Sequence, residues 1–435
     1  MENINELVIE ALNYSKSEYH SVNKIKEILL RNEFEELKEN APFNIKEGHK
    51  YFLIRNLSSI IAFSIPENIK NLYFKLVASH SDSPTYKIKS DPTIIENGYE
   101  KLKVEGYGGM IISSRLDKSL GIAGRIVYKK DNGIFSKLVD SSSDTCIIPN
   151  VAIHQNREVN NGFKYNNQID LCPIIGEEKE NGTHYDDLIS SFLDKGETFI
   201  SEDLYLYNRD KTRYVGLNKD FIAGPKLDDL SAAFTTLYGF IEAKNIDGID
   251  IFACFNNEEV GSLSNNGADS TFLNDTLRRI VLSLGKKEED YFIAVSKSIL
   301  LSADNAHAIH PNHPELSDNK NKCLINKGVV IKHNANMLYT SDALSTSFIK
   351  ELCKENNIAY QEFFNRSDVR GGSTLGNISN SHVSFLSVDI GLPQLAMHSN
   401  FEVIGSKDLN HLFNLTKIFM EKSFELNEAS IKLFY

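Results

Sequence analysis

The segment 249–262, IDIFACFNNEEVGS, is the feature that most constrains the fold of this chain. Its first seven residues are mostly apolar and have the length of a buried strand, and Glu258 and Glu259 follow almost directly. Two adjacent carboxylates at the end of a buried strand repel each other and lose hydration, so they need a group of opposite charge. The segment therefore predicts a buried sheet with a cationic group at its edge.

The patterns on either side of this segment predict an α/β domain. Apolar residues recur at roughly helical spacing over 4–38, and residues 228–245 carry one apolar helical stripe. The segments 51–65 and 71–80 are rich in β-branched and aromatic residues and are expected to be strands. Helices and strands therefore alternate at both ends of the chain.

The middle of the chain has a different character. Segment 101–107, KLKVEGY, alternates polar and apolar residues, which predicts a strand with one face in solvent. Segment 124–140 contains two strands around an Asp-Asn-Gly turn, which predicts a hairpin. We therefore expect an α/β domain formed by residues 1–91 and 223–435 and interrupted by a β-rich insertion at 92–222.

Composition excludes several classes of partner. The net charge is −12 and no basic block is present, so nucleic acid is not an expected partner. The longest apolar runs are far too short to span a membrane, and the acidic N-terminus does not resemble a secretory signal. The five cysteines are odd in number and form no C-x-x-C pair, which predicts reduced thiols in a cytoplasmic protein.

Several histidines and acidic residues fall just past apolar strands, where open α/β sheets place their sites. The candidates are His80, Asp82, Asp228, Glu258, Glu259, Asp304 and His398. Imidazole nitrogen together with carboxylate oxygen suits Zn²⁺, Mn²⁺ or Co²⁺.

A pair of divalent metal ions would stabilise the two adjacent glutamates. One carboxylate of Glu258-Glu259 can bind a metal ion while the other stays free to accept a proton from the attacking water. Asp228 lies just before a predicted helix and is well placed to bridge two ions. In an extended segment, residues two apart point to the same side, so Asp82 can orient the ring of His80.

Each candidate also has an ordinary structural interpretation. A histidine at a strand end is usually a satisfied or exposed polar residue, and adjacent glutamates usually lie in a solvated turn. Asp228 and Asp229 can form a helix N-cap. The segment 306–315 has three histidines at three-residue spacing, but its two prolines break any helix that would align them into a metal site.

Nine segments, in order, carry a resemblance to a known family. They are YFLIRNLSSIIAF, ASHSDSP, VEGYGG, AIHQNR, KLDDLSA, NNEEVGS, SADNAHAIHPN, GVVIKHNAN and DIGLPQLAMHS. With these segments, which span residues 50 to 400, the chain resembles the M18 metallopeptidases, the aspartyl aminopeptidase and aminopeptidase I group. The resemblance implies a three-layer α/β/α catalytic domain whose β-rich insertion is an oligomerisation domain.

The resemblance also implies a two-metal aminopeptidase that acts on peptides with a free N-terminus and binds two divalent ions per subunit, Zn²⁺ first, with Co²⁺ or Mn²⁺ as alternatives. The implied roles are Asp228 as the bridge, His80 and Asp304 at one ion, Glu259 and His398 at the other, Glu258 as general base and Asp82 behind His80.

Three further residues are expected to bind substrate, His154 and Lys332 from the resemblance and His307 from the proposed reaction. His154, in the insertion, is expected to reach the active site of a neighbouring subunit, since family members form dodecamers built from dimers. His154 or His307 is expected to help hold the oxyanion. Lys332 is expected to pair with an acidic first residue, although it can also be a lysine that extends from a strand end to solvent.

Alternatives of function stay open at this point. The same fold and metal site can serve a neutral, leucine-type aminopeptidase or a two-metal deacylase of small N-acyl amino acids. A metal-binding or assembly protein without catalysis would be expected to lack one of the site residues. The segment KLDDLSA has Lys226 and Asp229 where the family more often has Arg and Asn, but neither is the expected ligand.

Overall fold

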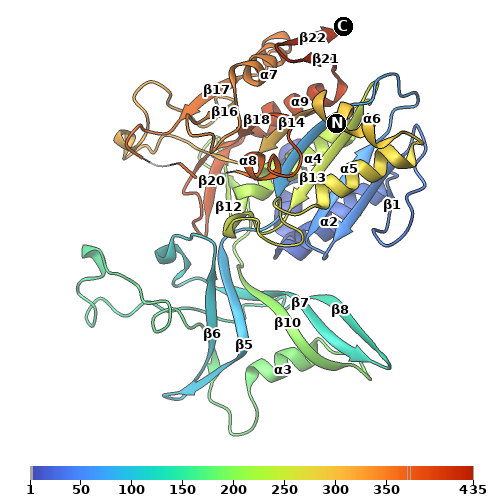
Figure 1. Cartoon of the computed structure of the whole chain (residues 1–435). Coiled ribbons are helices and arrows are strands. Elements are labelled where there is room, and N and C mark those ends of the chain that lie inside the picture. The colour runs from blue at the N-terminus through green and yellow to red at the C-terminus, as the bar shows by residue number, and fades with distance from the viewer. Residues whose placement is uncertain (1–2, 370, 373, 435) are drawn as a thin grey trace.

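The computed structural model describes residues 3–369, 371–372 and 374–434, and within them nine strands form the main sheet (Figure 1). In spatial order the strands are β1 (Glu35–Glu36), β2 (Lys50–Arg55), β3 (Ser59–Ser64), β13 (Ile249–Phe255), β4 (Phe74–His80), β14 (Ile299–Ala303), β18 (Leu386–Gly391), β16 (Val329–His333) and β17 (Tyr360–Phe364). The neighbours β13, β4, β14 and β18 are parallel. Their carboxyl ends therefore meet at one edge of this nine-stranded sheet.

Helices cover both faces of the nine-stranded sheet. One apolar core holds α1 (Ile4–Tyr14), α2 (Glu18–Arg31), α4 (Leu227–Glu242), α7 (Ala343–Glu355) and α9 (Asp408–Glu421). The other holds α5 (Phe272–Ser283), α6 (Glu288–Ser296) and α8 (Leu375–Ser379). Alternate residues of β13 enter different cores, Phe252 the first and Ile251 the second, as the two-residue repeat of a strand requires. This is the expected three-layer α/β/α arrangement.

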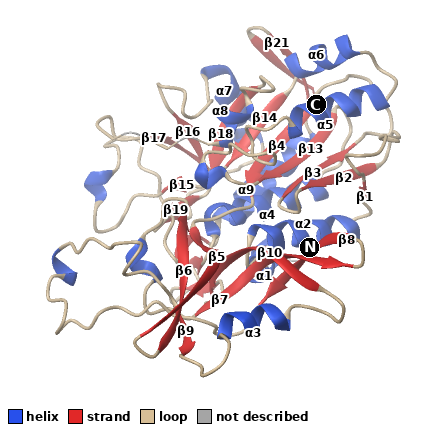
Figure 2. Ribbon diagram, turned by 60° about the horizontal axis from the view of Figure 1, so that its bottom comes forward, coloured by secondary structure: helices blue, strands red, loops and turns tan. Residues whose placement is uncertain are grey.

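Residues 85–208, all of them described, contain a separate six-stranded sheet. Its order is β8 (Gly133–Asp140), β7 (Leu120–Lys130), β10 (Thr198–Asn208), β5 (Thr85–Glu96), β6 (Tyr99–Tyr107) and β9 (Ile174–Glu177). In both views this sheet lies apart from the nine-stranded sheet, with α3 (His184–Ser191) at its far end (Figure 1, Figure 2). It has an apolar core of its own, to which Ile122 and Leu204 belong.

Two smaller sheets complete the described part of the chain. One contains β11 (Arg213–Val215), β12 (Phe221–Gly224), β20 (Glu402–Gly405), β19 (Pro393–Leu395) and β15 (Ala306–His307). The other is the C-terminal hairpin of β21 (Ser423–Asn427) and β22 (Ser430–Phe434). Short 3₁₀ helices lie at Ile112–Arg115, Val159–Asn161, Glu258–Val260 and Pro314–Leu316.

The predicted hairpin at 124–140 and the predicted helix at 228–245 are confirmed by β7–β8 and by α4. The single strand predicted at 51–65 is wrong. The structure has two strands there, β2 and β3, which pair antiparallel around a tight turn. Asn56 and Leu57 have φ values of 51° and 59°, the left-handed backbone that such hairpin turns require. Leucine rarely adopts this conformation, so a leucine between two apolar segments does not predict a turn.

The predicted helical region 4–38 is interrupted as well. It consists of α1, α2 and, at its end, the short strand β1, and the chain leaves the helix between Tyr14 and Glu18. Ser15 and Ser17 have extended backbones, and the hydroxyl of Ser15 donates to the carbonyl oxygen of Ala11 in the last turn of α1. Serine competes with the helix through such local hydrogen bonds, and this break lets two helices pack in one core.

Candidate metal centre

The candidate ligands converge at the carboxyl ends of the central parallel strands. His80 is the last residue of β4, Asp304 directly follows β14, and Glu258 and Glu259 lie in the 3₁₀ turn after β13. Asp228 comes from the first turn of α4, where its backbone is not helical. Chain segments more than two hundred residues apart thus supply one cluster of side chains.

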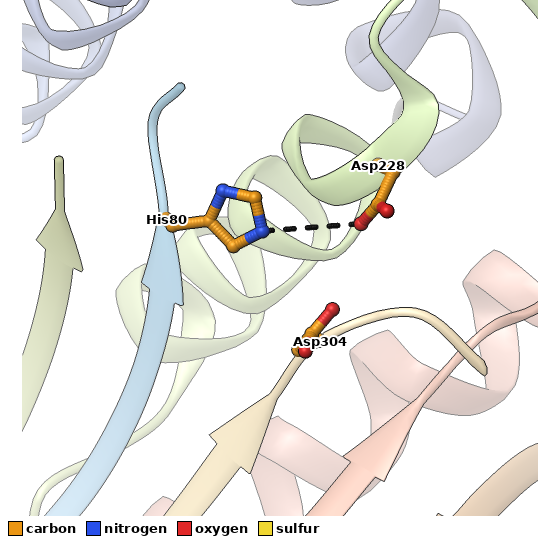
Figure 3. Close-up of side chains that lie close together, drawn as sticks. All are labelled: His80, Asp228 and Asp304. Carbon is orange, nitrogen blue, oxygen red and sulfur yellow. Dashed lines mark ion pairs between the residues drawn. The ribbon is translucent and has the colours of Figure 1, made fainter. Parts of the chain in front are cut away.

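One part of the cluster consists of His80, Asp228 and Asp304. A ligand atom of each lies within 4.8 Å of those of the other two, and all three residues are buried. The Nε2 atom of His80 is 3.9 Å from Oδ1 of Asp228. Figure 3 shows the imidazole of His80 extending from β4 toward Asp228, with Asp304 at the end of the neighbouring strand. One imidazole and two carboxylates are a suitable donor set for a divalent ion.

A second part consists of Asp228, Glu259 and His398, again with ligand atoms within 4.8 Å of one another. The Nε2 atom of His398 is 3.2 Å from Oδ2 of Asp228 and 3.4 Å from Oε2 of Glu259. Asp228 therefore belongs to both parts and directs a different oxygen toward each histidine. This is the geometry of a carboxylate that can bridge two ions.

The acidic residues of the cluster are only partly compensated by His80, His398 and Lys332. Burial raises the pKa of Glu258 to about 8, and the neighbouring carboxylates add to this effect while His80 opposes it. Burial and the charge of Asp228 raise the pKa of Glu259 well above its ordinary value. Among the described residues, Oδ1 of Asp228 and Oε1 of Glu259 are buried without a hydrogen-bond partner. These oxygens and this donor set fit a divalent cation.

Asp82 supports the cluster from behind, in more ways than its spacing predicts. The Nδ1 atom of His80 lies 3.1 Å from the backbone oxygen of Asp82 and 3.4 Å from its carboxylate. The same carboxylate accepts the backbone N–H groups of Glu258 and Glu259, each at 3.2 Å. Asp82 thus fixes both the first histidine and the turn that presents the two glutamates.

Tyr107 is a residue of the site that the sequence analysis missed. It ends β6 of the six-stranded sheet, and its hydroxyl donates to Oδ2 of Asp82 at 2.7 Å. The side-chain amide of Asn257 donates to the same hydroxyl at 2.9 Å, and Asn257 has a left-handed backbone, with φ of 63°. Tyrosine in an alternating strand gives no signal of such a contact; only the VEGYGG segment of the resemblance marked its position.

A cavity of about 150 Å³ adjoins the cluster and is lined by its ligands together with His307, Lys332, Tyr339 and Phe363. Lys332 does not extend to solvent: its side chain is 3% exposed, and Nζ lies 3.3 Å from Asp304 and 3.2 Å from the carbonyl oxygen of Asn305. Burial lowers the pKa of Lys332, but Asp304 and other acidic groups outweigh burial and raise it overall. The lysine therefore carries a charge beside the cavity.

His154 and His307 are placed differently. His307 ends β15, lines the cavity and is exposed to solvent. His154 is exposed and is not among the described residues that line the cavity. Its expected place in the site of a neighbouring subunit stays a prediction, since the structure contains one chain.

A three-layer α/β/α domain with histidines and carboxylates gathered at the ends of its parallel strands defines a metal-dependent hydrolase. The family model described as aminopeptidase I zinc metalloprotease (M18) matches residues 11–420. The chain belongs to this M18 family and is a metallo-aminopeptidase. The probable M18 family aminopeptidase 2 of Clostridium acetobutylicum is 43% identical over 428 residues, 96% of each chain.

Solved structures agree with this assignment. In the cryo-EM structure of the Ape4 and Nbr1 complex, one chain superimposes with a TM-score of 0.92 and 32% identity, over 97% of this chain and 86% of that chain. The mApe1 dodecamer of S. cerevisiae gives a TM-score of 0.80 and 26% identity over 97% of both chains. No helix in the described part of this chain is both long enough and apolar enough to cross a membrane.

Proposed function

We propose that this aminopeptidase binds two divalent metal ions per subunit and hydrolyses the peptide bond after the first residue of peptides with a free N-terminus. The observation that carries the proposal is the position of Asp228 in two groups of ligands at once. His80 and Asp304 complete one group, and Glu259 and His398 the other. The family description favours Zn²⁺, and Co²⁺ and Mn²⁺ suit the same ligands. When bound, the ions would supply Lewis acidity and make water a nucleophile near neutral pH.

Glu258 is the proposed general base. Its carboxylate lies with the imidazole of His80 and the carboxylate of Glu259 in a third group of possible ligands, and its backbone N–H donates to Asp82. Glu258 accepts a proton from the attacking water and returns it to the leaving amine. General bases of this kind contribute about 10²- to 10⁴-fold to the rate. Asp82 fixes the positions of His80 and of the turn that carries Glu258.

Lys332 is the proposed determinant of a preference for Asp or Glu as the first residue. Its buried ammonium group lines the cavity and can pair with a substrate carboxylate. Because Nζ already lies beside Asp304, a neutral, leucine-type preference is the second candidate. His307, which lines the same cavity, is proposed to assist at the oxyanion.

The region 92–222 is the proposed oligomerisation domain. The dodecamer of the S. cerevisiae relative supports a homo-oligomer, a dodecamer built from dimers, for this chain as well. His154 lies exposed in this region, which suits the proposed role in a neighbouring subunit's site. All five cysteines, each within the described residues, are free thiols, which supports the proposed cytoplasmic location.

A panel of p-nitroanilides tests these proposals together. The first residue would be Asp, Glu, Leu or Lys, and the enzyme would be stripped of metal and refilled with Zn²⁺, Co²⁺ or Mn²⁺. We expect activity to return with metal, with two ions per subunit at saturation, and to be highest on the acidic substrates. An N-acetylated amino acid, with release of acetate as the readout, serves as the control for a deacylase. Faster cleavage of that substrate than of the free-amine peptide would contradict the aminopeptidase assignment of the site.

A further inference from the structure

The carboxylate of Glu402 holds the backbones of two proposed metal ligands at once. Glu402 opens β20, and its residue is 2% exposed. Its Oε2 accepts the backbone N–H of Asp228 at 3.0 Å, and its Oε1 accepts the backbone N–H of His398 at 2.7 Å. The side chains of these two residues meet at 3.2 Å, between Oδ2 and Nε2. One buried group therefore joins the two chain segments that carry these two proposed ligands.

The topology explains how one carboxylate reaches both segments. β20 pairs antiparallel with β12, and Glu402 is the partner of Gly224, just before the chain enters α4 and Asp228. His398 lies four residues before Glu402 and has a left-handed backbone, with φ of 65°. A non-glycine residue in that conformation needs support from its surroundings. The bond from its N–H group to Glu402 supplies that support.

A charged side chain is costly at a buried position unless it is hydrogen-bonded, and both oxygens of Glu402 are. Arg115 and Lys226 line a small cavity of about 30 Å³ together with Glu402. Glutamine is the neutral residue of the same shape, but its NH₂ group would replace one of the two accepting oxygens and face a backbone N–H group, donor against donor.

We propose that Glu402 is a positioning residue of the metal centre, whose two oxygens fix Asp228 and His398 so that their side chains face the same ion. This inference rests on the proposed function, since it concerns the ion that these two residues would share. Hydrogen-bond partners of metal ligands of this kind contribute about 10- to 100-fold to metal affinity.

Glu402→Gln tests the inference, with Zn²⁺ affinity as the readout. The Kd is measured on metal-free protein by competition with a chromophoric chelator, and the Tm of the metal-free protein is recorded beside it. Asp408→Asn is the matched control, because Asp408 is also a buried carboxylate that accepts two backbone N–H groups, those of Asn326 and Gly328. Neither Asn326 nor Gly328 is a proposed ligand.

We expect Glu402→Gln to raise the Zn²⁺ Kd about 10- to 100-fold. Asp408→Asn should lower Tm and leave that Kd within about twofold. Equal Kd values for wild type and Glu402→Gln, or equal changes in both variants, would overturn the inference. If Glu402→Gln does not fold, Glu402→Asp decides, because it keeps both oxygens but retracts them. An unchanged Kd there overturns the inference, and a raised Kd supports it.

The result separates this inference from the proposed function. If the wild-type protein binds Zn²⁺ tightly and Glu402→Gln binds it equally well, only the role of Glu402 fails. If the wild-type protein binds no divalent ion, the proposed function itself fails and takes the inference with it.

Discussion

The hydroxyl of Tyr107, at the end of the six-stranded sheet, donates a 2.7 Å hydrogen bond to the carboxylate of Asp82, two residues beyond a strand of the nine-stranded sheet. Asp82 in turn holds His80 and the backbone of the two glutamates. The two sheets therefore meet at a hydrogen-bond network directly behind the candidate metal centre. A displacement of Tyr107 at the end of β6 would therefore act through Asp82 on His80 and on the turn that carries Glu258 and Glu259.

Tyr107→Phe should reduce kcat while the chain stays folded. The change leaves one oxygen of a buried carboxylate with fewer donors, and the loss of such a partner behind metal ligands costs about 10- to 100-fold. The measurement is kcat and KM on the preferred p-nitroanilide, with Tm alongside. Tyr99→Phe is the matched control, since Tyr99 begins the same strand and is 49% exposed. A wild-type kcat in Tyr107→Phe would show that Asp82 does not need this donor.

Much of the candidate site could be predicted from the sequence, because parallel strands bring their carboxyl ends to one edge. Residues that directly follow apolar runs, such as His80, Asp304 and Glu259, are therefore brought together by the sheet itself. The α/β class and the β-rich middle could be predicted for a different reason. Repeats of two and of 3.6 residues are local properties of the chain and can be read directly from the sequence.

The remainder of the site depends on contacts between distant segments, which leave no local pattern. In the sequence, Tyr107 is an ordinary residue of a strand with alternating polarity. Its role depends on the contact of its hydroxyl with Asp82, which follows a strand of the other sheet. Glu402 contacts the backbone of Asp228, 174 residues away in the chain. The turn at Asn56 and Leu57 was missed because its strands are equally apolar on both sides.

The buried ion pair of Lys75 and Asp250 predicts a pH dependence of stability. Burial raises the pKa of Asp250 to about 7, even though Lys75, with Nζ 3.0 Å away, opposes the shift. The unfolded value is about 3.9. Because the folded pKa is the higher one, the contribution of Asp250 to stability is complete below about pH 4 and is lost as pH rises to about 7.

This pH dependence is measured as the free energy of unfolding in urea for wild type and Asp250→Asn, both metal-free, between pH 5 and pH 8. The difference between the two proteins should shrink as pH rises, because only the wild type titrates at this position. A difference that grows with pH would mean that Lys75 stabilises the ionised carboxylate more than burial penalises it.

Lys332→Met should change the preference for the first residue. If the ammonium group of Lys332 pairs with acidic substrates, its removal costs them about 1.5–3 kcal/mol, which is roughly 10- to 150-fold. The ratio of kcat/KM for Asp and Leu p-nitroanilides is the decisive quantity, because loss of the contact with Asp304 lowers both rates. Lys350→Met, at a lysine that pairs with Glu362, is the control. An unchanged ratio in Lys332→Met would assign the preference to other residues.

Substitution by glutamine should have different effects at the two adjacent glutamates, on kcat at Glu258 and on metal binding at Glu259. Oε2 of Glu259 lies 3.4 Å from Nε2 of His398 within a proposed ligand group, whereas Glu258 is the proposed base. Glu258→Gln should keep both ions and lose about 10²- to 10⁴-fold in kcat. Glu259→Gln should weaken Zn²⁺ binding by at least roughly tenfold, the smallest loss expected even for a hydrogen-bond partner of a ligand.

Metal content and kcat are measured on the same preparations of both variants, so each protein is the control for the other. Isosteric changes at neighbouring positions have similar effects on folding, and a difference between the variants therefore reports on chemistry. If Glu258→Gln loses zinc while Glu259→Gln keeps zinc and loses turnover, the two roles are exchanged. If both variants keep full activity, neither carboxylate takes part in the reaction, and the edge of the sheet is not the active site.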